Sequence, residues 1–229
     1  MTSFVLAHGG WAGGWQWQEV ALLLRQAGHE VYTPTFTGLG ERVHLARPDI
    51  DLNTYIQDIL MVLKYEDLHD VILLGYSISG AVISGVAEKF ADRISHLVYL
   101  DAYVLDDEQS VADQVGPEIM NGIVQAAEMF GDGWRIPHDP PDADRRTDQA
   151  LKPVLTPLTV KNPAAAALPR TFIYCTQGAQ DIGPLHLPIA HAAEKAKGDN
   201  HWRYRELETG HMPMWTAPKE LVDLLLELT

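Results

Sequence analysis

Residues 71–80 read VILLGYSISG and place a serine between an apolar run and a helical pattern. The run 71–74 predicts a buried strand, and residues 78–90 have helical spacing. Ser77 therefore lies in a sharp strand-to-helix turn, which lifts its hydroxyl above a sheet and is typical of a nucleophile. Gly75 is the small neighbour such a turn needs, whereas Ser79 replaces the second glycine of G-x-S-x-G, with Gly80 directly after it. The alternative is a serine that only caps the helix.

Strand and helix patterns alternate on both sides of this turn. Apolar runs at 4–8, 30–34, 96–100, 171–175 and 202–207 predict further strands, and helical spacing fills 15–27, 53–65, 187–197 and 217–228. The alternation predicts an α/β fold with about six parallel strands and helices on both faces. Residues 102–168 interrupt it for longer than the ~2–6 residues of an ordinary connection. We therefore expect one domain over 1–229 with a cap inserted at about 102–168.

Composition narrows the class of protein. The 229 residues are 46% hydrophobic and 21% charged, as in an ordinary globular chain. A formal net charge of −14 argues against nucleic-acid partners and anionic membranes. Cys175 is the single cysteine, and neither a secretory signal nor a membrane-spanning stretch is evident. We expect a cytoplasmic protein that acts on a small molecule, with a homodimer left open. Since no Walker A, zincin or dinucleotide motif is found, we expect no metal and no cofactor.

His211 is the candidate base among the ten histidines. The partners of Ser77 must lie at the carboxyl ends of the strands, where the serine is. His211 lies in the loop 208–213, which leaves the last predicted strand at that edge. His201 precedes the same strand, roughly 20 Å away, and His191 falls inside a helical pattern. His186 is the remaining alternative.

The acid is expected between the nucleophile and the histidine in the chain. Asp181 is the only carboxylate of the loop 176–181, which follows the strand 171–175. Its role is to hold the imidazole of His211 in the right tautomer and to stabilise the imidazolium. The sequence favours Asp181, with Asp101 at the end of the strand 96–100 as the rival. The structural alternative for Asp101 is a carboxylate that accepts backbone N–H groups.

Glycines close the first predicted strand, in the stretch His8-Gly9-Gly10-Trp11. They allow a backbone N–H to approach a substrate closely. We expect the N–H groups of Gly10 and Ile78 to bind the oxyanion of a tetrahedral intermediate. His8 is expected to support this loop through a hydrogen bond.

Large apolar side chains of the cap and of two loops are candidates for a substrate pocket, with a small separate cap core as the alternative. They are Trp11, Met120, Trp134, Met212 and Trp215. The group His138, Asp139, Asp142 and Asp144 contains metal-ligand types. Its spacing fits no metal motif and encloses Pro140-Pro141, so we expect a solvated loop.

These segments together resemble one branch of the α/β-hydrolases, that of plant methyl esterases, hydroxynitrile lyases and bacterial carboxylesterases, including pyrethroid-type ester hydrolases. The resemblance covers nearly the whole chain and rests on residues 8–15, 33–42, 75–80, 98–103 and 210–211. It implies an α/β-hydrolase fold, an oxyanion hole of Gly10 and Ile78, and Asp181 as the acid. The implied function is a serine hydrolase that cleaves a hydrophobic carboxylic ester through an acyl-enzyme.

Two departures from that branch bear on the reaction. The lyases carry a lysine directly after the catalytic histidine and a threonine early in the first loop, where this chain has Met212 and Gly9. Cyanide would therefore lack its counter-ion, which argues against lyase activity. An amidase, a lactonase or a C–C hydrolase with the same triad remains the alternative, and a ligand-binding receptor without catalysis is a further one.

Overall fold

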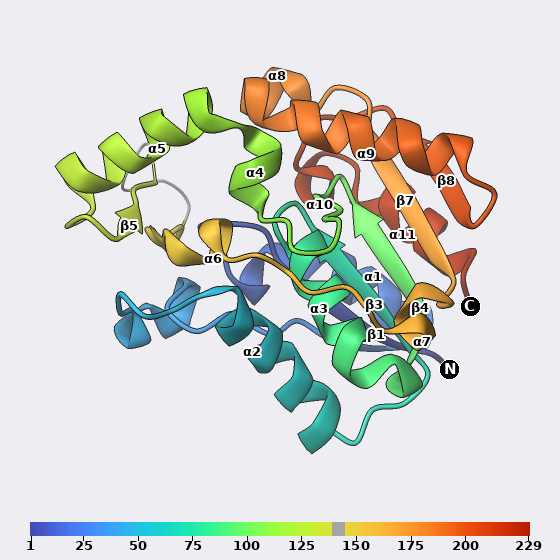
Figure 1. The fold of residues 1–229 in the computed structure, drawn as a ribbon. Coiled ribbons are helices and arrows are strands. Elements are labelled where there is room, and N and C mark those ends of the chain that lie inside the picture. Colours follow the sequence, from blue (N-terminus) through green and yellow to red (C-terminus); the bar gives the residue numbers. More distant parts are fainter. Residues whose placement is uncertain (139–144) are drawn as a thin grey trace.

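A six-stranded sheet forms the centre of the computed structural model, which describes residues 1–138 and 145–229 (Figure 1). The spatial order is β2-β1-β3-β4-β7-β8, and every adjacent pair is parallel. The prediction of about six parallel strands is therefore confirmed. The strands are β1 (Ser3–Ala7), β2 (Glu30–Tyr32), β3 (Val71–Tyr76), β4 (Ile94–Leu100), β7 (Arg170–Cys175) and β8 (Trp202–Leu207).

The position of each strand follows from its sequence. All six residues of β3 are buried, because helices cover both faces of a central parallel strand and leave no side exposed to water. The edge strand β8, with the sequence WRYREL, carries charged residues and is mostly accessible. The apolar run 71–74 thus lies at the centre of the sheet, directly beneath the turn that holds Ser77.

Five longer helices cover the sheet in two layers. One face packs against α1 (Gln18–Gln26) and α11 (Pro218–Leu226), in a core that includes Trp17, Leu24 and Leu225. The other face packs against α2 (Leu52–Tyr65), α3 (Ser79–Phe90) and α9 (Leu187–Gly198). The short helices are η1 (Gly14–Trp17), η2 (Gly40–Leu45), η3 (Ala91–Arg93), α8 (Ala179–Ile182), η4 (Gly183–His186) and α10 (Pro213–Thr216).

The segment between β4 and β7 breaks the alternation. Most of its elements lie beyond the tips of the central strands, whereas the last of them, residues 163–166, lies at the opposite end of the sheet (Figure 1). They are α4 (Val111–Val115), α5 (Pro117–Phe130), the antiparallel pair β5 (Arg135–Ile136) and β6 (Gln149–Ala150), α6 (Lys152–Leu155) and α7 (Pro163–Ala166). Of the group first considered as metal ligands, Asp139, Asp142 and Asp144 lie outside the described residues. The backbone N–H of His138 donates to Asp148 Oδ1 at 3.1 Å.

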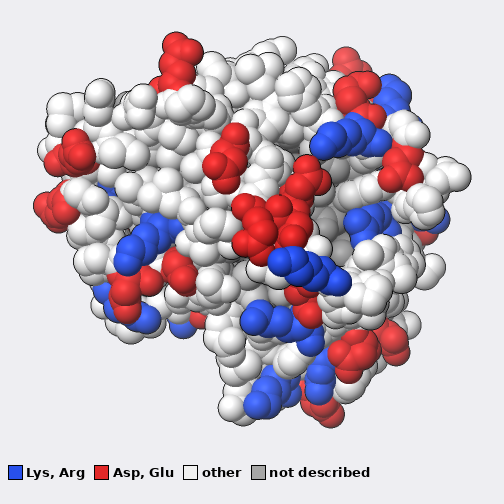
Figure 2. All heavy atoms as spheres, viewed as in Figure 1, with Lys and Arg blue, Asp and Glu red and all other residues white. Residues whose placement is uncertain are grey.

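The surface carries charged side chains of both signs, in agreement with the composition (Figure 2). On the face shown in Figure 2, acidic and basic side chains are interspersed among uncharged residues. Within the described part of the chain, no helix is long and apolar enough to cross a membrane.

Candidate active site

Ser77 occupies a strained turn between β3 and α3. Its φ is 57°, a left-handed value that is uncommon for a residue with a side chain. A Cβ on Gly75 would lie 2.3 Å from the backbone oxygen of Ser79, and one on Gly80 would lie 2.1 Å from that of Tyr103. Both positions therefore require glycine, and the packing on either side holds Ser77 in its strained conformation.

Ser79 has a specific partner in this turn. Its hydroxyl donates a short hydrogen bond to the backbone oxygen of His8, and its side chain is fully buried. The bond joins the serine turn to the loop that follows β1. The replacement of the usual glycine by Ser79 therefore adds a link between the two loops that surround the nucleophile.

The structure brings Ser77 and His211 together. The loop after β8 places His211 Nε2 3.1 Å from Ser77 Oγ, within hydrogen-bonding distance. His211 Nδ1 lies 2.6 Å from Asp101 Oδ2. An ionised carboxylate only accepts hydrogen bonds, so Nδ1 carries the proton and Nε2 is free to accept one from the serine. Serine, imidazole and carboxylate thus form a continuous hydrogen-bonded chain.

The prediction that the Asp181 carboxylate contacts the imidazole of His211 is wrong. Asp181 is exposed, and its Oδ2 accepts the backbone N–H of His211 at 2.6 Å. The loop after β7 instead presents Gly178 towards Asp101, since a Cβ there would lie 2.8 Å from Asp101 Oδ2. Gly178 itself has no side chain that could contact the imidazole of His211. Asp181 therefore orients the loop that carries His211, and the rival position at the end of β4 contacts the ring.

Strand register explains why Asp101 is well placed. In the pairing of β3 with β4, Leu100 lies opposite Tyr76. Asp101 and Ser77 are therefore the next residues of two adjacent strands, and both have positive φ values, 41° and 57°. The sequence signal for this contact is a carboxylate that directly follows β4, the neighbour of the strand that leads to Ser77.

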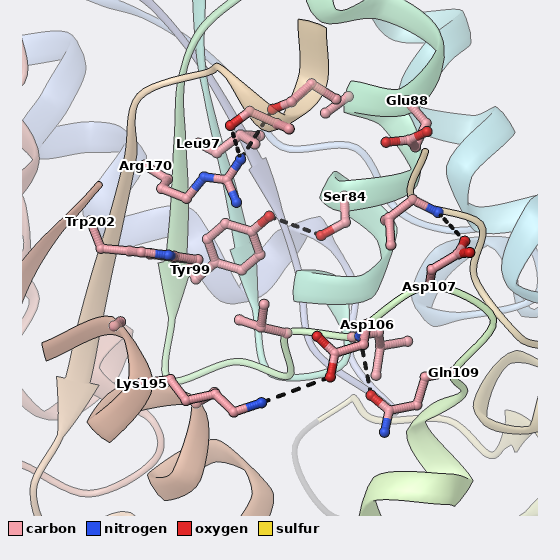
Figure 3. A pocket seen from close by; sticks show the side chains of 18 of the residues that line it. Ser84, Glu88, Leu97, Tyr99, Asp106, Asp107, Gln109, Arg170, Lys195 and Trp202 are labelled. Atoms are coloured by element: carbon pink, nitrogen blue, oxygen red, sulfur yellow. Dashed lines mark hydrogen bonds and ion pairs between the residues drawn. The ribbon is translucent and has the colours of Figure 1, made fainter. Parts of the chain in front are cut away.

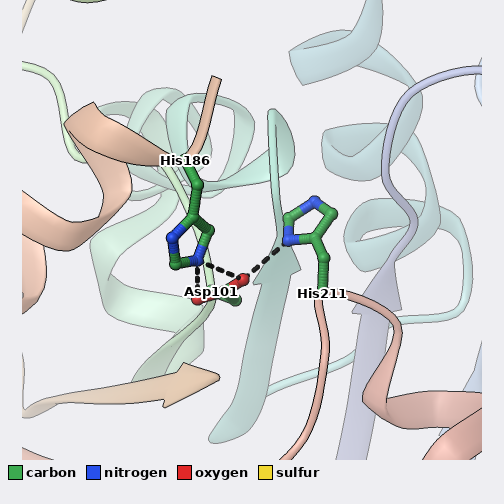
Figure 4. A group of neighbouring side chains, drawn as sticks. All are labelled: Asp101, His186 and His211. Carbon is green, nitrogen blue, oxygen red and sulfur yellow. Dashed lines mark hydrogen bonds and ion pairs between the residues drawn. The ribbon is translucent and has the colours of Figure 1, made fainter. Parts of the chain in front are cut away.

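Asp101 is completely buried and fully hydrogen-bonded (Figure 4). It accepts hydrogen bonds from His211 Nδ1, from His186 Nε2 at 3.0 Å and from the backbone N–H of Cys175 at 3.1 Å. Burial alone would raise the pKa of Asp101, but the hydrogen bonds and charges of His186 and His211 outweigh it and hold the pKa below its ordinary value. The carboxylate therefore stays ionised beside the imidazole. His186, the alternative base in the sequence, contacts this carboxylate.

Asp101, His186 and His211 also offer three ligand atoms that a metal ion could use. The nitrogen–oxygen distances between them are 2.6–3.1 Å, as in direct hydrogen bonds. Ligands on zinc each lie about 2.0–2.2 Å from the ion. The residues would have to separate before an ion could enter, so this arrangement fits a hydrogen-bonded triad better than a metal site.

Two residues with a free backbone N–H in the described structure line the same cavity as Ser77. Gly10 follows β1 and Ile78 opens α3, and both residues line the cavity that contains the serine hydroxyl. Within residues 1–138 and 145–229, neither N–H donates to another protein group. The loop is held in place by Gln149, whose Oε1 accepts the N–H of Trp11 at 3.2 Å. Unpaired N–H groups on either side of a nucleophile are what an oxyanion hole requires.

His8 supports this loop, as expected. The ring is buried, with Nδ1 2.7 Å from the Gly9 oxygen and Nε2 accepting the N–H of Phe36 at 3.0 Å. Burial lowers the pKa of His8 to about 4, although the hydrogen bond to Gly9 opposes this. A neutral imidazole with a proton on Nδ1 satisfies both contacts.

The cavity above Ser77 has a volume of about 310 Å³ and a largely apolar wall. Of the five predicted pocket residues, Trp11, Met120, Met212 and Trp215 line it, and Trp134 does not. Trp134 packs against the main core instead, with the Arg135 guanidinium over its ring. Elements between β4 and β7 close the cavity through Val111, Ile136 and Val154. Three polar residues that the sequence pattern did not indicate also line the cavity, Gln16, Arg146 and Gln149.

A larger hollow of about 810 Å³ lies elsewhere, between α3, α7 and α9 (Figure 3). Several of its polar groups are already paired within the protein. The Tyr99 and Ser84 hydroxyls bond to each other, Arg170 donates to backbone oxygens of α7, and Lys195 pairs with Asp106. The hollow is lined by none of Ser77, Asp101 and His211 and is separate from the candidate active site.

Known proteins share this fold and sequence pattern. Residues 4–224 match the model of the alpha/beta hydrolase family. The chain is 34% identical to a carbendazim hydrolyzing esterase from Nocardioides sp., in an alignment 247 positions long that covers 100% of both proteins. It is 33% identical to methylesterase 1 of Arabidopsis thaliana over 49% of this chain and 45% of that protein.

Solved structures agree with this. An extracellular alpha/beta-hydrolase from a Paenibacillus species superposes with a TM-score of 0.82 at 28% identity, covering 100% of this chain and 99% of the other. A pyrethroid hydrolase from Sphingobium faniae shares the fold, with a TM-score of 0.76 at 22% identity over 99% and 96% of the two chains.

Proposed function

Because the chain belongs to the alpha/beta hydrolase family, we propose that Ser77, His211 and Asp101 form its catalytic triad. The protein is an ester-cleaving hydrolase of the carboxylesterase type, as its full-length similarity to an esterase shows. The observation that carries the proposed triad is the hydrogen-bonded chain from Ser77 Oγ through His211 to Asp101 Oδ2. Cys175 is no competing nucleophile, since burial and then the charges of Asp101 and Asp181 raise the pKa of its thiol well above the ordinary value.

The first half of the reaction forms an acyl-enzyme. Ser77 Oγ attacks the ester carbonyl carbon while His211 Nε2, 3.1 Å away, takes the hydroxyl proton. The backbone N–H groups of Gly10 and Ile78 stabilise the oxyanion, each lowering the barrier by about 3–4 kcal/mol. Asp101 stabilises the imidazolium through Nδ1. The carbon–oxygen bond to the alcohol then breaks, and His211 Nε2 returns its proton to the leaving alkoxide.

The second half releases the acid. His211, again neutral, takes a proton from a water molecule, whose oxygen attacks the acyl carbon of the Ser77 ester. The same oxyanion donors act on the second tetrahedral intermediate. Its collapse breaks the bond to Ser77 Oγ, which recovers its proton from His211. The products are a carboxylic acid, an alcohol and the free enzyme.

The cavity supports a small to medium apolar substrate. Its volume of about 310 Å³ and its wall of methionine, tryptophan and aliphatic side chains suit a hydrophobic ester. A relative is named for carbendazim, so this carbamate ester belongs in a substrate panel beside aryl esters. An amide, a lactone and a C–C substrate complete the panel, because the same triad can cleave all of them.

Labelling with a fluorophosphonate probe tests the nucleophile. We expect the wild-type protein to be labelled at Ser77, and Ser77→Ala to lose both labelling and turnover of a 4-nitrophenyl ester. A Ser95→Ala variant is the matched control, because it removes the hydroxyl of an exposed serine that does not line the cavity. Wild-type turnover by Ser77→Ala would exclude the proposed mechanism. An unlabelled wild-type protein would favour a ligand-binding receptor.

We further propose that the protein works in the cytoplasm. The support is its single cysteine, which is buried and forms no disulfide. Its substrate partner is then a small molecule, and self-association into a dimer is testable by light scattering. Cell fractionation with an antibody tests the location, and recovery in the culture medium would contradict it.

A further inference from the structure

The active-site cavity contains one strong positive charge that the triad does not use. Arg146 is half-buried and is the one Lys or Arg among the described lining residues of this cavity. Its guanidinium is held on three sides: Nη1 lies 3.0 Å from His138 Nε2, Nη2 donates to Met212 Sδ at 3.0 Å, and the group lies over the Trp215 ring. Arg146 is therefore fixed against the wall next to the loop of His211.

Among the described residues, these contacts leave the charge of Arg146 without an ion-pair partner. An imidazole nitrogen and a thioether sulfur are neutral acceptors, and the sulfur is a weak one. No carboxylate of a described residue forms an ion pair with Arg146, whereas Arg42, Arg47, Arg93, Arg135 and Arg205 each have one. The other arginines without such a pair among the described residues do not line the active-site cavity. Guanidinium groups match carboxylates in geometry as well as charge. A partly desolvated arginine in an apolar cavity thus has room for an anionic partner from outside the chain.

Further donors lie in the same wall. Gln149 is buried and uses Oε1 to accept the N–H of Trp11, which leaves its amide N–H groups without a partner in the described structure. Gln16 is also buried, and its Nε2 has no hydrogen-bond partner. A buried donor without a partner, as at Gln16, is rare and costly, whereas the Gln149 nitrogen is accessible at the cavity wall. Both groups can donate to an anion that has several oxygens.

We propose that Arg146 forms an anion subsite in the ester-binding cavity, and that the preferred substrates are apolar esters with a carboxylate remote from the scissile bond. The inference rests on the proposed function and specifies its substrate class. Asp181 is the acidic residue among the lining residues and lies at the His211 backbone, so the carboxylate of the substrate is placed on the Arg146 side.

Matched pairs of esters test this subsite. One pair carries the charge in the acyl part: mono-4-nitrophenyl glutarate against 4-nitrophenyl valerate. The other carries it in the alcohol part: 4-acetoxybenzoate against 4-methylphenyl acetate. The measured quantity is the ratio of kcat/KM for the charged ester to that for the neutral one. In at least one pair we expect a wild-type ratio of about 10 or more, the value of a charge-assisted hydrogen bond.

The variants separate charge from packing. Arg146→Met keeps an apolar stem against Trp215 and should lower this ratio about 10- to 100-fold, with Arg146→Lys between the two. Arg145→Met is the matched control: it removes the same charge from an exposed neighbour that does not line the cavity, and should leave the ratio unchanged. Ratios at or below one in both wild-type pairs, or equal in wild type and Arg146→Met, would overturn the subsite. If no ester of any kind were cleaved, the proposed function itself would fail.

Discussion

Replacing Asp101 with asparagine separates the roles of the two carboxylates near His211. The variant keeps the side-chain volume but removes the charge 2.6 Å from Nδ1. At an effective dielectric constant of about 20, a carboxylate and an imidazolium about 3 Å apart attract by about 5.5 kcal/mol. Since about 1.4 kcal/mol corresponds to a tenfold change in rate, Asp101→Asn should lower kcat by about 10³- to 10⁴-fold.

Asp181→Asn is the matched comparison. Its carboxylate bonds the backbone N–H of His211 from an exposed position, and an asparagine oxygen can keep that bond. We expect less than about a tenfold loss of kcat, in line with the small value of an exposed hydrogen bond. The assay is steady-state hydrolysis of a 4-nitrophenyl ester, with circular dichroism to confirm that each variant is folded. A larger loss for Asp181→Asn than for Asp101→Asn, or less than about a tenfold loss for folded Asp101→Asn, would contradict the role of Asp101 as the acid of the triad.

Three further predictions concern stability, each measured by urea unfolding. A Cβ at Gly75 would lie 2.3 Å from the Ser79 oxygen, so Gly75→Ala should cost about 1–3 kcal/mol or more. Gly122 lies in a helix with nothing near its Cβ position, and Gly122→Ala should instead add about 0.5–1 kcal/mol. The folded pKa of His8 is about 4 because of burial, against 6.5 in the unfolded chain, so only the unfolded state gains a proton between these values. The contribution of His8 to stability should therefore fall by about 3 kcal/mol from pH 6.5 to 4. Stability should decrease less steeply in His8→Gln than in a variant of the exposed His44, and equal slopes would contradict this.

The framework of the fold could be predicted because it rests on local patterns. The buried strands are short apolar runs ended by glycine or a polar residue, and β3 shows this most clearly. The nucleophile turn could also be predicted, since Gly75 and Gly80 are the residues that its close contacts demand. The base could be predicted from strand direction, because His211 lies in the loop that leaves the last strand at the edge where Ser77 lies.

The acid could not be predicted in the same way. Both Asp101 and Asp181 follow strands at the correct edge, and the order of residues in the chain allows either. The choice depends on the left-handed conformation of Asp101 and on the turn at Gly178, neither of which leaves a periodic signal. The contact of His186 with Asp101 depends on the same turn and was missed for the same reason.

The segment between β4 and β7 was the least predictable part. Its strands are two residues long, and it has no sustained period from which to assign inward-facing side chains. Trp134 therefore looked like a pocket residue although it packs on the core. Arg146 gave no signal in the sequence, because only the folded chain places it beside Met212 and Trp215.

Trapping the acyl-enzyme tests most directly whether Ser77 is the nucleophile. The wild-type protein is mixed briefly with a 4-nitrophenyl ester, quenched in acid, and analysed by intact mass and peptide mapping. We expect a mass increase equal to the acyl group, located on Ser77 and absent in Ser77→Ala. An acyl group found on another residue, or ester cleavage at the same rate by Ser77→Ala, would contradict it.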